Sequence, residues 1–132
     1  MSQPTVLLVD DEPDIRFLVS MALRKLGGLE VRAEPSGQAA LTALTSGYRP
    51  DMIILDVMMP DMDGIQTLQA IRGLPDFANL PVCFLTAKIQ PGEVAYLRSL
   101  GVCDVMAKPF SPAALVKQLQ ECWQSCARTT ST

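Results

Sequence analysis

Polar side chains follow four apolar runs of this 132-residue chain, at the point where each run ends. The runs end within residues 9–12, 55–64, 85–87 and 107–110. The side chains concerned are those of Asp10, Asp11, Asp56, Thr86 and Lys108. Open α/β sheets bind their ligands at the carboxyl ends of the strands. If the runs are strands of one sheet, they predict a joint site for Mg²⁺ and a phosphoryl group.

The three acids indicate the metal. Asp10 and Asp11 follow the first apolar run and Asp56 follows the third, so the carboxylates converge if those strands are neighbours. Carboxylates that close repel one another unless a cation lies between them. Oxygen ligands favour a hard ion, and few protein ligands favour Mg²⁺ over Ca²⁺. Capping of the helix that begins near Pro13 is the alternative, but it explains only one of the three acids.

Asp56 also has the chemistry of a phosphoacceptor. An irregular loop follows it, so its carboxylate can face solvent beside a metal and attack a phosphoryl group to form an aspartyl phosphate. Thr86 could donate its hydroxyl to the phosphoryl oxygens, and Lys108 could pair first with Asp56 and then with the phosphoryl group. Taken singly, each residue is an ordinary turn, strand or surface residue. The Lys108–Pro109 bond is a candidate cis peptide.

The periodicity of apolar residues predicts five strands that alternate with five helices. The strands are residues 5–9, 29–33, 52–55, 82–85 and 102–107. The helices are residues 13–26, 36–46, 65–71, 91–100 and 111–126, with Ser36 and Ser111 as N-caps. This alternation predicts an α/β fold, a doubly wound parallel sheet with right-handed crossovers, in one domain.

Composition excludes several classes of protein. The formal net charge is −3, without a basic stripe, so direct nucleic-acid binding is not expected. No apolar run approaches the roughly 20 residues of a membrane span. The first residues lack the basic segment with which an export signal begins, so export is not expected. The four cysteines form no Cys-x-x-Cys pair and there is no histidine, which argues against a zinc site. We expect Cys83, Cys103, Cys122 and Cys126 to be buried, reduced thiols of a cytosolic protein.

Taken together, the motifs resemble those of the receiver domain of bacterial two-component response regulators (chemotaxis-regulator-like). The matching pieces, in order along the chain, are Asp10-Asp11, Asp56 within Asp-Val-Met-Met-Pro-Asp-Met-Asp-Gly, Thr86-Ala87 and Lys108-Pro109-Phe110. The resemblance implies a flavodoxin-like three-layer sandwich with strand order 2-1-3-4-5. It assigns residues 1–126 to the receiver domain and leaves residues 127–132 as a short polar tail, which we expect to be disordered.

The resemblance also implies the role of each site residue. Asp56 is the phosphoacceptor, assisted by Thr86 and Lys108. Asp11 and Asp56 ligate Mg²⁺ directly, Asp10 acts mainly through water, and the backbone carbonyl of Met58 is a further ligand. The phosphoryl donor is a phosphohistidine on a sensor histidine kinase or a histidine phosphotransfer protein. The resemblance therefore implies a cytoplasmic signalling switch that changes its contacts with a downstream protein. It implies no enzymatic activity beyond the protein's own phosphorylation and dephosphorylation.

Two features depart from the family pattern. Many receivers carry Tyr or Phe where this chain has Val105, so an aromatic ring cannot turn inward on activation. The output surface is formed by the helix after Pro91, the fifth strand and the last helix. We expect it to move less than in receivers with the aromatic residue, or by a different mechanism. Met58 and Lys88 lie two residues beyond Asp56 and Thr86, where receivers tune the lifetime of the phosphoryl group.

Three other functions remain open at this stage. A haloacid-dehalogenase-like phosphatase requires Asp-x-Asp after the first strand, where this chain has Asp-Asp-Glu. A flavodoxin-like mononucleotide binder requires a phosphate-cradling loop there, and the acids would repel a phosphate. A pseudo-receiver would lack reactive positions that this chain has. We expect a stand-alone regulator, with a receiver excised from a larger protein as the alternative.

Overall fold

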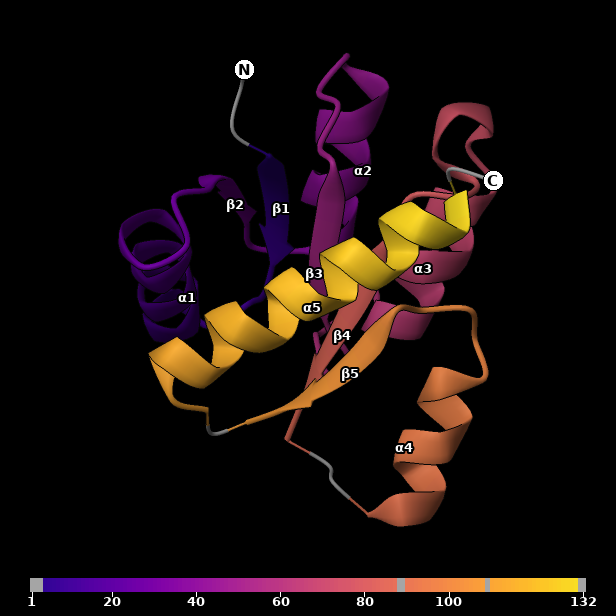
Figure 1. Cartoon of the computed structure of the whole chain (residues 1–132). Helices are drawn as coiled ribbons and strands as arrows, with labels where there is room; N and C mark the ends of the chain where they lie inside the picture. Colours follow the sequence, from indigo (N-terminus) through magenta and orange to yellow (C-terminus); the bar gives the residue numbers. More distant parts are fainter. Residues whose placement is uncertain (1–3, 88–89, 109, 131–132) are drawn as a thin grey trace.

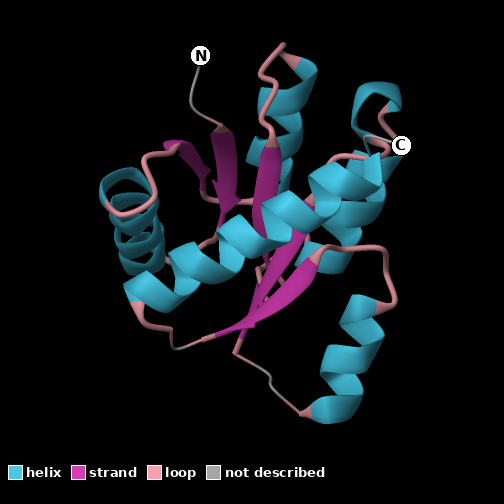
Figure 2. Ribbon diagram, viewed as in Figure 1, coloured by secondary structure: helices cyan, strands magenta, loops and turns pink. Residues whose placement is uncertain are grey.

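The computed structural model describes residues 4–87, 90–108 and 110–130, with side chains as far as Gln124. A five-stranded parallel sheet lies between two layers of helices (Figure 1, Figure 2). Its strand order is β2-β1-β3-β4-β5. The predicted α/β fold and strand order are therefore confirmed.

Each predicted strand and helix is present, with small shifts at the ends. The strands are β1 (Thr5–Val9), β2 (Glu30–Glu34), β3 (Met52–Asp56), β4 (Val82–Thr86) and β5 (Asp104–Ala107). The helices are α1 (Pro13–Lys25), α2 (Gly37–Thr45), α3 (Gly64–Arg72), α4 (Pro91–Arg98) and α5 (Pro112–Thr130), with a 3-10 helix η1 (Pro75–Phe77). The η1 helix was not predicted because a single turn leaves no periodic signal. Strands β3 and β4 include Asp56 and Thr86, so both residues are held by the sheet.

The central strands form the core of the sheet because helices cover both of their faces. All residues of β3 and β4 are buried, whereas the edge strand β2 is largely exposed. A parallel strand covered on both faces reads as a continuous apolar run, which is why these strands were visible in the sequence.

Alternate residues of each strand enter two separate cores. One core packs Leu8, Ile54 and Leu85 against α1 and α5. The other packs Leu7, Ile53 and Phe84 against α2, α3 and α4. The result is a three-layer sandwich that fixes the sheet from both sides and holds its carboxyl edge in place.

Three of the helices begin at a polar N-cap residue whose side chain accepts a hydrogen bond from the first turn. The hydroxyls of Ser36 and Ser111 accept hydrogen bonds from Ala39 N and Ala114 N, as predicted. In the loop after β3, the Asp63 carboxylate accepts from Gln66 N at 2.8 Å, and the Gln66 side chain accepts from Asp63 N at 3.0 Å. This capping box starts α3 and fixes the end of the loop that follows Asp56.

The last helix is longer than predicted. It continues to Thr130, beyond the predicted end at Cys126, and no Gly or Pro interrupts it there. The expectation of disorder was therefore wrong for residues 127–130. No helix in the described part of the chain combines the length and apolar character needed to cross a membrane. Lys88, Pro109 and the side chain of Cys126 lie outside the described structure, so the predictions made for them, including the cis peptide, remain predictions.

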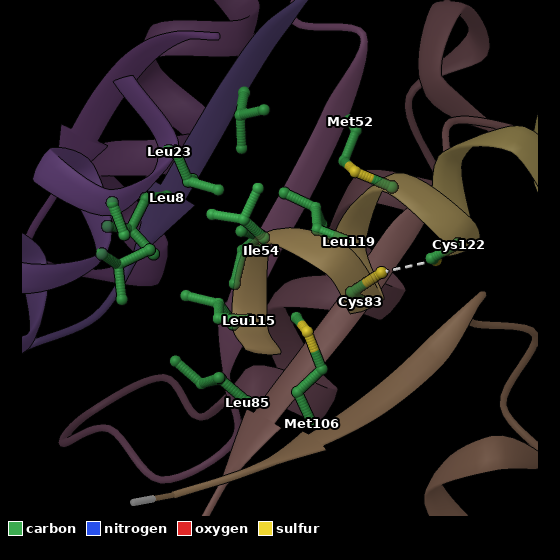
Figure 3. Packing of buried hydrophobic residues seen from close by; sticks show 14 residues of the cluster. Leu8, Leu23, Met52, Ile54, Cys83, Leu85, Met106, Leu115, Leu119 and Cys122 are labelled. Carbon is green, nitrogen blue, oxygen red and sulfur yellow. Dashed lines mark hydrogen bonds between the residues drawn. The ribbon is translucent and has the colours of Figure 1, made fainter. Parts of the chain in front are cut away.

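The cysteines depart in part from the prediction. Cys83 on β4 and Cys122 on α5 are free and buried, as expected, and their sulfur atoms lie 2.8 Å apart (Figure 3). Cys103 is disulfide-bonded, so the prediction of a reduced thiol was wrong at this position. It is only partly buried against the core of α1 and α5. Sequence spacing could not reveal the approach of Cys122 to Cys83 because it does not fix how α5 lies across the sheet.

Candidate functional site

Two acids meet at the carboxyl edge of the sheet because β1 and β3 are neighbours. Val9 pairs with Leu55 in the parallel register, and Asp10 and Asp56 are the next residues on the two strands. Backbone hydrogen bonds continue past the strand ends, from Asp10 N to Glu34 O at 3.2 Å and from Val57 N to Leu85 O at 3.0 Å. The sheet itself therefore brings together two acids that lie far apart in the sequence.

Four acids form one cluster at this edge. Ligand oxygens of Asp10, Asp11, Glu12 and Asp56 all lie within 4.8 Å of one another. Asp10 and Asp56 are buried, with 0% and 2% exposure, Asp11 is half-buried and Glu12 is exposed. The expectation that the Asp56 carboxylate faces solvent was therefore wrong, because β3 is buried along its whole length. Glu12 was not among the predicted site residues. Its position directly after Asp10-Asp11 was the available signal.

The two buried carboxylates each keep one oxygen without a hydrogen bond. Asp10 Oδ1 accepts from Glu12 N at 2.8 Å, and Asp56 Oδ1 accepts from Met58 N at 3.3 Å. Asp10 Oδ2 and Asp56 Oδ2 are buried and accept no hydrogen bond. Buried polar atoms in folded proteins nearly always have partners. These two oxygens, neither of them hydrogen-bonded, could therefore serve as part of the oxygen ligand set of a hard divalent cation.

Lys108 brings a positive charge into the same cluster. Its Nζ lies 3.0 Å from Asp10 Oδ2, 3.3 Å from Glu12 Oε1 and 3.4 Å from Asp56 Oδ1. The contact with Asp10 Oδ2 is an ion pair without the directional geometry of a hydrogen bond. Lys108 N also donates to Thr86 O at 2.8 Å, which ties the residue to the end of β4. Only 11% of the Lys108 side chain is exposed, so its charge is directed inward.

The electrostatics of the cluster are those of crowded acids. Burial, followed by the negative charge of Asp10, raises the pKa of Asp56 to about 7, although Lys108 and the Met58 N–H oppose the shift. Burial disfavours the charged form of Lys108, but Asp10, Asp56 and Glu12 together outweigh it and raise the pKa of the lysine. Near neutral pH, Asp56 is therefore poised between its protonated form and a reactive carboxylate.

The remaining predicted residues surround this cluster. Thr86 ends β4 and is 1% exposed. Met58 is 55% exposed, and its backbone N–H faces Asp56. Both residues line an open pocket of about 450 Å³ that extends to Tyr96 on α4. The pocket lies beside the acid cluster, since Val57 and Met58 directly follow Asp56 in the chain.

Gly64 explains how the loop after Asp56 can return so close to the strand. A Cβ at Gly64 would lie 2.4 Å from the backbone oxygen of Asp56 and 2.7 Å from the Cα of Val57. Gly64 N donates to Val57 O at 2.9 Å, which closes the loop. A residue with a side chain cannot fit there without moving Asp56.

Comparison with known proteins agrees with this geometry. The family model described as the response regulator receiver domain matches residues 6–120. The chain is 38% identical over 126 residues to the probable transcriptional regulatory protein TcrX of Mycobacterium tuberculosis, which covers 96% of this chain and 52% of that protein. It is 35% identical over 122 residues to an uncharacterized 14.6 kDa protein of Leptolyngbya boryana, covering 92% and 91% of the two chains.

Solved structures show the same fold. The chemotaxis response regulator CheY4 of Vibrio cholerae has a TM-score of 0.83 and 35% sequence identity, covering 92% of this chain and 99% of that chain. A putative response regulator from Chloroflexus aurantiacus has a TM-score of 0.84 and 32% identity, covering 93% and 99%. The chain spans about half the length, or less, of most of the curated relatives it matches. From its match over most of its length, the chain belongs to the response regulator receiver domain family.

Proposed function

We propose that this receiver is a magnesium-dependent phosphoacceptor in which Asp56 receives a phosphoryl group from a phosphohistidine. The observation that carries the proposal is the pair of buried, unbonded oxygens of Asp10 and Asp56, with the Lys108 ammonium within 3.4 Å of both acids. Asp56 Oδ2 has no partner at all, and Asp10 Oδ2 has only its ion pair with Lys108. Membership of the receiver family supports the signalling role.

The residues present fit Mg²⁺. Asp10, Asp11 and Asp56 supply carboxylate oxygens, and we assign the backbone carbonyl of Met58 as a further ligand. Cysteine and histidine ligands, which favour softer ions, are absent from the acid cluster. When bound, Mg²⁺ would neutralise charge on the transferred phosphoryl oxygens and orient them for attack. It would also relieve the repulsion that raises the pKa of Asp56.

Asp56 is the nucleophile of the transfer step. A carboxylate oxygen of Asp56 forms a bond to phosphorus while the bond between phosphorus and the donor histidine nitrogen breaks. The freed imidazole of the donor keeps the electron pair of that bond and takes up a proton from solvent. Since the 132 residues contain no histidine, the donor lies outside them, on a sensor histidine kinase or a histidine phosphotransfer protein.

Lys108 and Thr86 hold the product. Phosphorylation adds a charge of about −1.5 to −2 and three acceptor oxygens to Asp56. The Lys108 ammonium, already beside Asp56, donates to one of these oxygens, and the Thr86 hydroxyl donates to another. Hydrolysis by water entering through the pocket beside Met58 returns the protein to its resting state.

The output surface is formed by α4, β5 and α5. Asp104 on β5 ties the three elements together, since its Oδ1 lies 3.1 Å from Arg98 on α4 and its Oδ2 accepts from Gln118 on α5 at 3.2 Å. Movement of Thr86 and Lys108 at the ends of β4 and β5 would reach this surface through the strands. We propose that a downstream protein reads the change there and that the receiver works in the cytoplasm, without an enzymatic activity on other substrates.

The experiment is to incubate the protein with acetyl phosphate and Mg²⁺ and to measure its intact mass. We expect one phosphoryl increment in the wild type and none in Asp56→Asn. Asp61→Asn is the matched control because Asp61 is an exposed acid in the same loop. Its φ of 67° is also one that asparagine adopts readily.

Three results would contradict the proposal. The first is a wild-type protein that is folded but gains no phosphoryl group. The second is an increment that persists in Asp56→Asn, which would place the acceptor elsewhere. The third is full phosphorylation after Mg²⁺ has been removed with a chelator, which would remove the metal from the reaction.

A further inference from the structure

Two cysteines outside the phosphoacceptor site face each other in the core. Cys83 lies on β4 and Cys122 on α5, 39 residues later in the chain. Figure 3 shows the Cys83 side chain directed toward Cys122, and their sulfur atoms are 2.8 Å apart. A disulfide bond requires about 2.05 Å, so the two atoms need to approach by less than about 1 Å.

The surroundings hold the two thiols in this position. Cys83 is 0% exposed and Cys122 is 6% exposed, within the core that packs α1 and α5 on the sheet. Strand β4 is hydrogen-bonded to β3 on one side and to β5 on the other, so Cys83 cannot move away without disrupting the sheet. Leu119, one turn before Cys122, packs in the same core and fixes the face that α5 presents to β4.

We propose that Cys83 and Cys122 form a dithiol site that a small peroxide oxidises to a disulfide, covalently joining β4 to α5. Hydrogen peroxide suits the site better than a bulky disulfide because neither thiol is open enough to carry a large adduct. If the receiver works in the cytoplasm, as proposed above, such a bond is reversible and regulatory, since cytosolic disulfides are usually transient and redox-sensing.

The oxidation proceeds in two balanced steps. Cys122, the more exposed thiol, attacks one peroxide oxygen as its thiolate, giving a sulfenic acid and one water after proton uptake. The Cys83 sulfur then displaces the hydroxyl group from that sulfur, forming the disulfide and a second water. The two thiols lose two electrons and two protons, and the peroxide gains both. A thiol reductant reverses the change.

The bond would act on the same strand that serves the phosphoacceptor site. Cys83 lies three residues before Thr86 on β4, and the disulfide would fix α5 to that strand. Cys103, partly buried in the same core, is already disulfide-bonded. An experiment must therefore identify which cysteines are joined.

The test is peptide mapping of the full chain. The protein is reduced, freed of reductant, treated with hydrogen peroxide under native conditions, quenched in acid, alkylated and digested with trypsin. We expect a species in which peptide 73–88, which holds Cys83, is joined to peptide 118–128, which holds Cys122. Fragmentation of the wild-type species assigns the bond to Cys122 or to Cys126 without any substitution.

Variants and an unfolded sample sharpen the assignment. Cys122→Ala should abolish the linked species, and Cys126→Ala should retain it. In urea, four cysteines can pair in three ways, so the Cys83–Cys122 bond should fall to roughly a third of the linked product. Oxidised wild type should show a higher Tm than its reduced form, and the increase should be smaller in Cys122→Ala, which can still re-form the bond at Cys103.

The proposal is overturned if folded protein in excess peroxide gives no linked species, or if Cys122 accumulates as sulfinic acid instead. A native bond from Cys83 to Cys103 or Cys126 would overturn it equally. None of these readouts uses Asp56, Mg²⁺ or a phosphoryl donor. Failure here would therefore leave the phosphoacceptor proposal untouched, and failure of phosphorylation would leave this one standing.

Discussion

The Lys108 ammonium lies closer to Asp10 Oδ2, at 3.0 Å, than to Asp56 Oδ1, at 3.4 Å. In the resting protein the positive charge therefore compensates the fully buried acid more closely than the proposed phosphoacceptor. This asymmetry agrees with the raised pKa of Asp56, which reaches about 7 despite the nearby ammonium. It also places the lysine where a bound cation would compete with it for Asp10.

Removing the charge of Lys108 should lower the stability of the metal-free protein but strengthen its binding of Mg²⁺. Lys108→Met keeps the length of the side chain and leaves two buried acids uncompensated. Without Mg²⁺ we expect a loss of about 3 kcal/mol in the free energy of unfolding, measured in urea, because breaking a buried ion pair leaves unpaired charge. We expect Mg²⁺ to bind several-fold more tightly, measured by calorimetry. Lys117→Met, at an exposed position of α5, should change neither quantity; weaker Mg²⁺ binding in Lys108→Met would contradict the competition.

The raised pKa of Asp56 predicts a pH-dependent loss of stability in metal-free protein. The carboxyl titrates near pH 7 when folded and near 3.8 when unfolded, so between these values the unfolded chain binds fewer protons. Stability should therefore fall as pH rises through this window, by roughly 1 kcal/mol for each pH unit, and level off above about pH 7.

The measurement is the difference in unfolding free energy between wild type and Asp56→Asn at several pH values. This difference cancels the titration of the other acids. At pH 7 and above, saturating Mg²⁺ should raise the unfolding free energy of the wild type relative to that of Asp56→Asn, because the metal stabilises the ionised carboxylate. A difference that stays constant from pH 4 to 7 would show that the pKa of Asp56 is not raised.

Two glycine substitutions should have opposite effects. In Gly64→Ala the new Cβ would meet the Asp56 backbone oxygen at 2.4 Å, so the loop must move and stability should fall by about 2 kcal/mol or more. Mg²⁺ binding should weaken with it. In Gly92→Ala no atom lies within 4 Å of the new Cβ, and α4 should gain up to about 1 kcal/mol. Chemical unfolding of both variants tests the contrast, which an equal effect of the two would refute.

Val105 should remain in place when phosphorylation is mimicked. It is 7% exposed and packs in the core that faces α2, α3 and α4, with no ring to turn. We expect a beryllofluoride adduct to shift Thr86 and Lys108 while Val105 keeps its rotamer. Methyl NMR with and without the adduct reports this directly, and a change in the Val105 χ1 population would count against the prediction.

The sequence predicted those parts of the site that depend on the sheet. Asp10, Asp56, Thr86 and Lys108 follow or end apolar runs, and parallel strands bring such residues to one edge. The sequence could not predict that Glu12 would approach Lys108, because an exposed acid before a helix is ordinarily solvated. These are placements; the roles of the residues remain proposals until the phosphorylation experiment is done.

Features that depend on helix orientation could not be predicted. The period of apolar residues in α5 shows which side faces the core but not which strand residue it meets, so the approach of Cys122 to Cys83 was invisible. The bond at Cys103 was also missed, because no spacing of cysteines in the sequence marks it. The predicted second strand, residues 29–33, begins and ends one residue earlier than β2, which is Glu30–Glu34. Few apolar residues define the bounds of this exposed edge strand.

The two oxygens of Asp10 and Asp56 that accept no hydrogen bond also have a consequence for the rate at which the protein is degraded in a cell. Whatever binds only the folded form stabilises it in proportion to the logarithm of ligand concentration. If the acid cluster binds Mg²⁺ as proposed, the protein should unfold most often, and be degraded fastest, when Mg²⁺ is scarce. The abundance of this receiver would then follow magnesium supply before any kinase has acted.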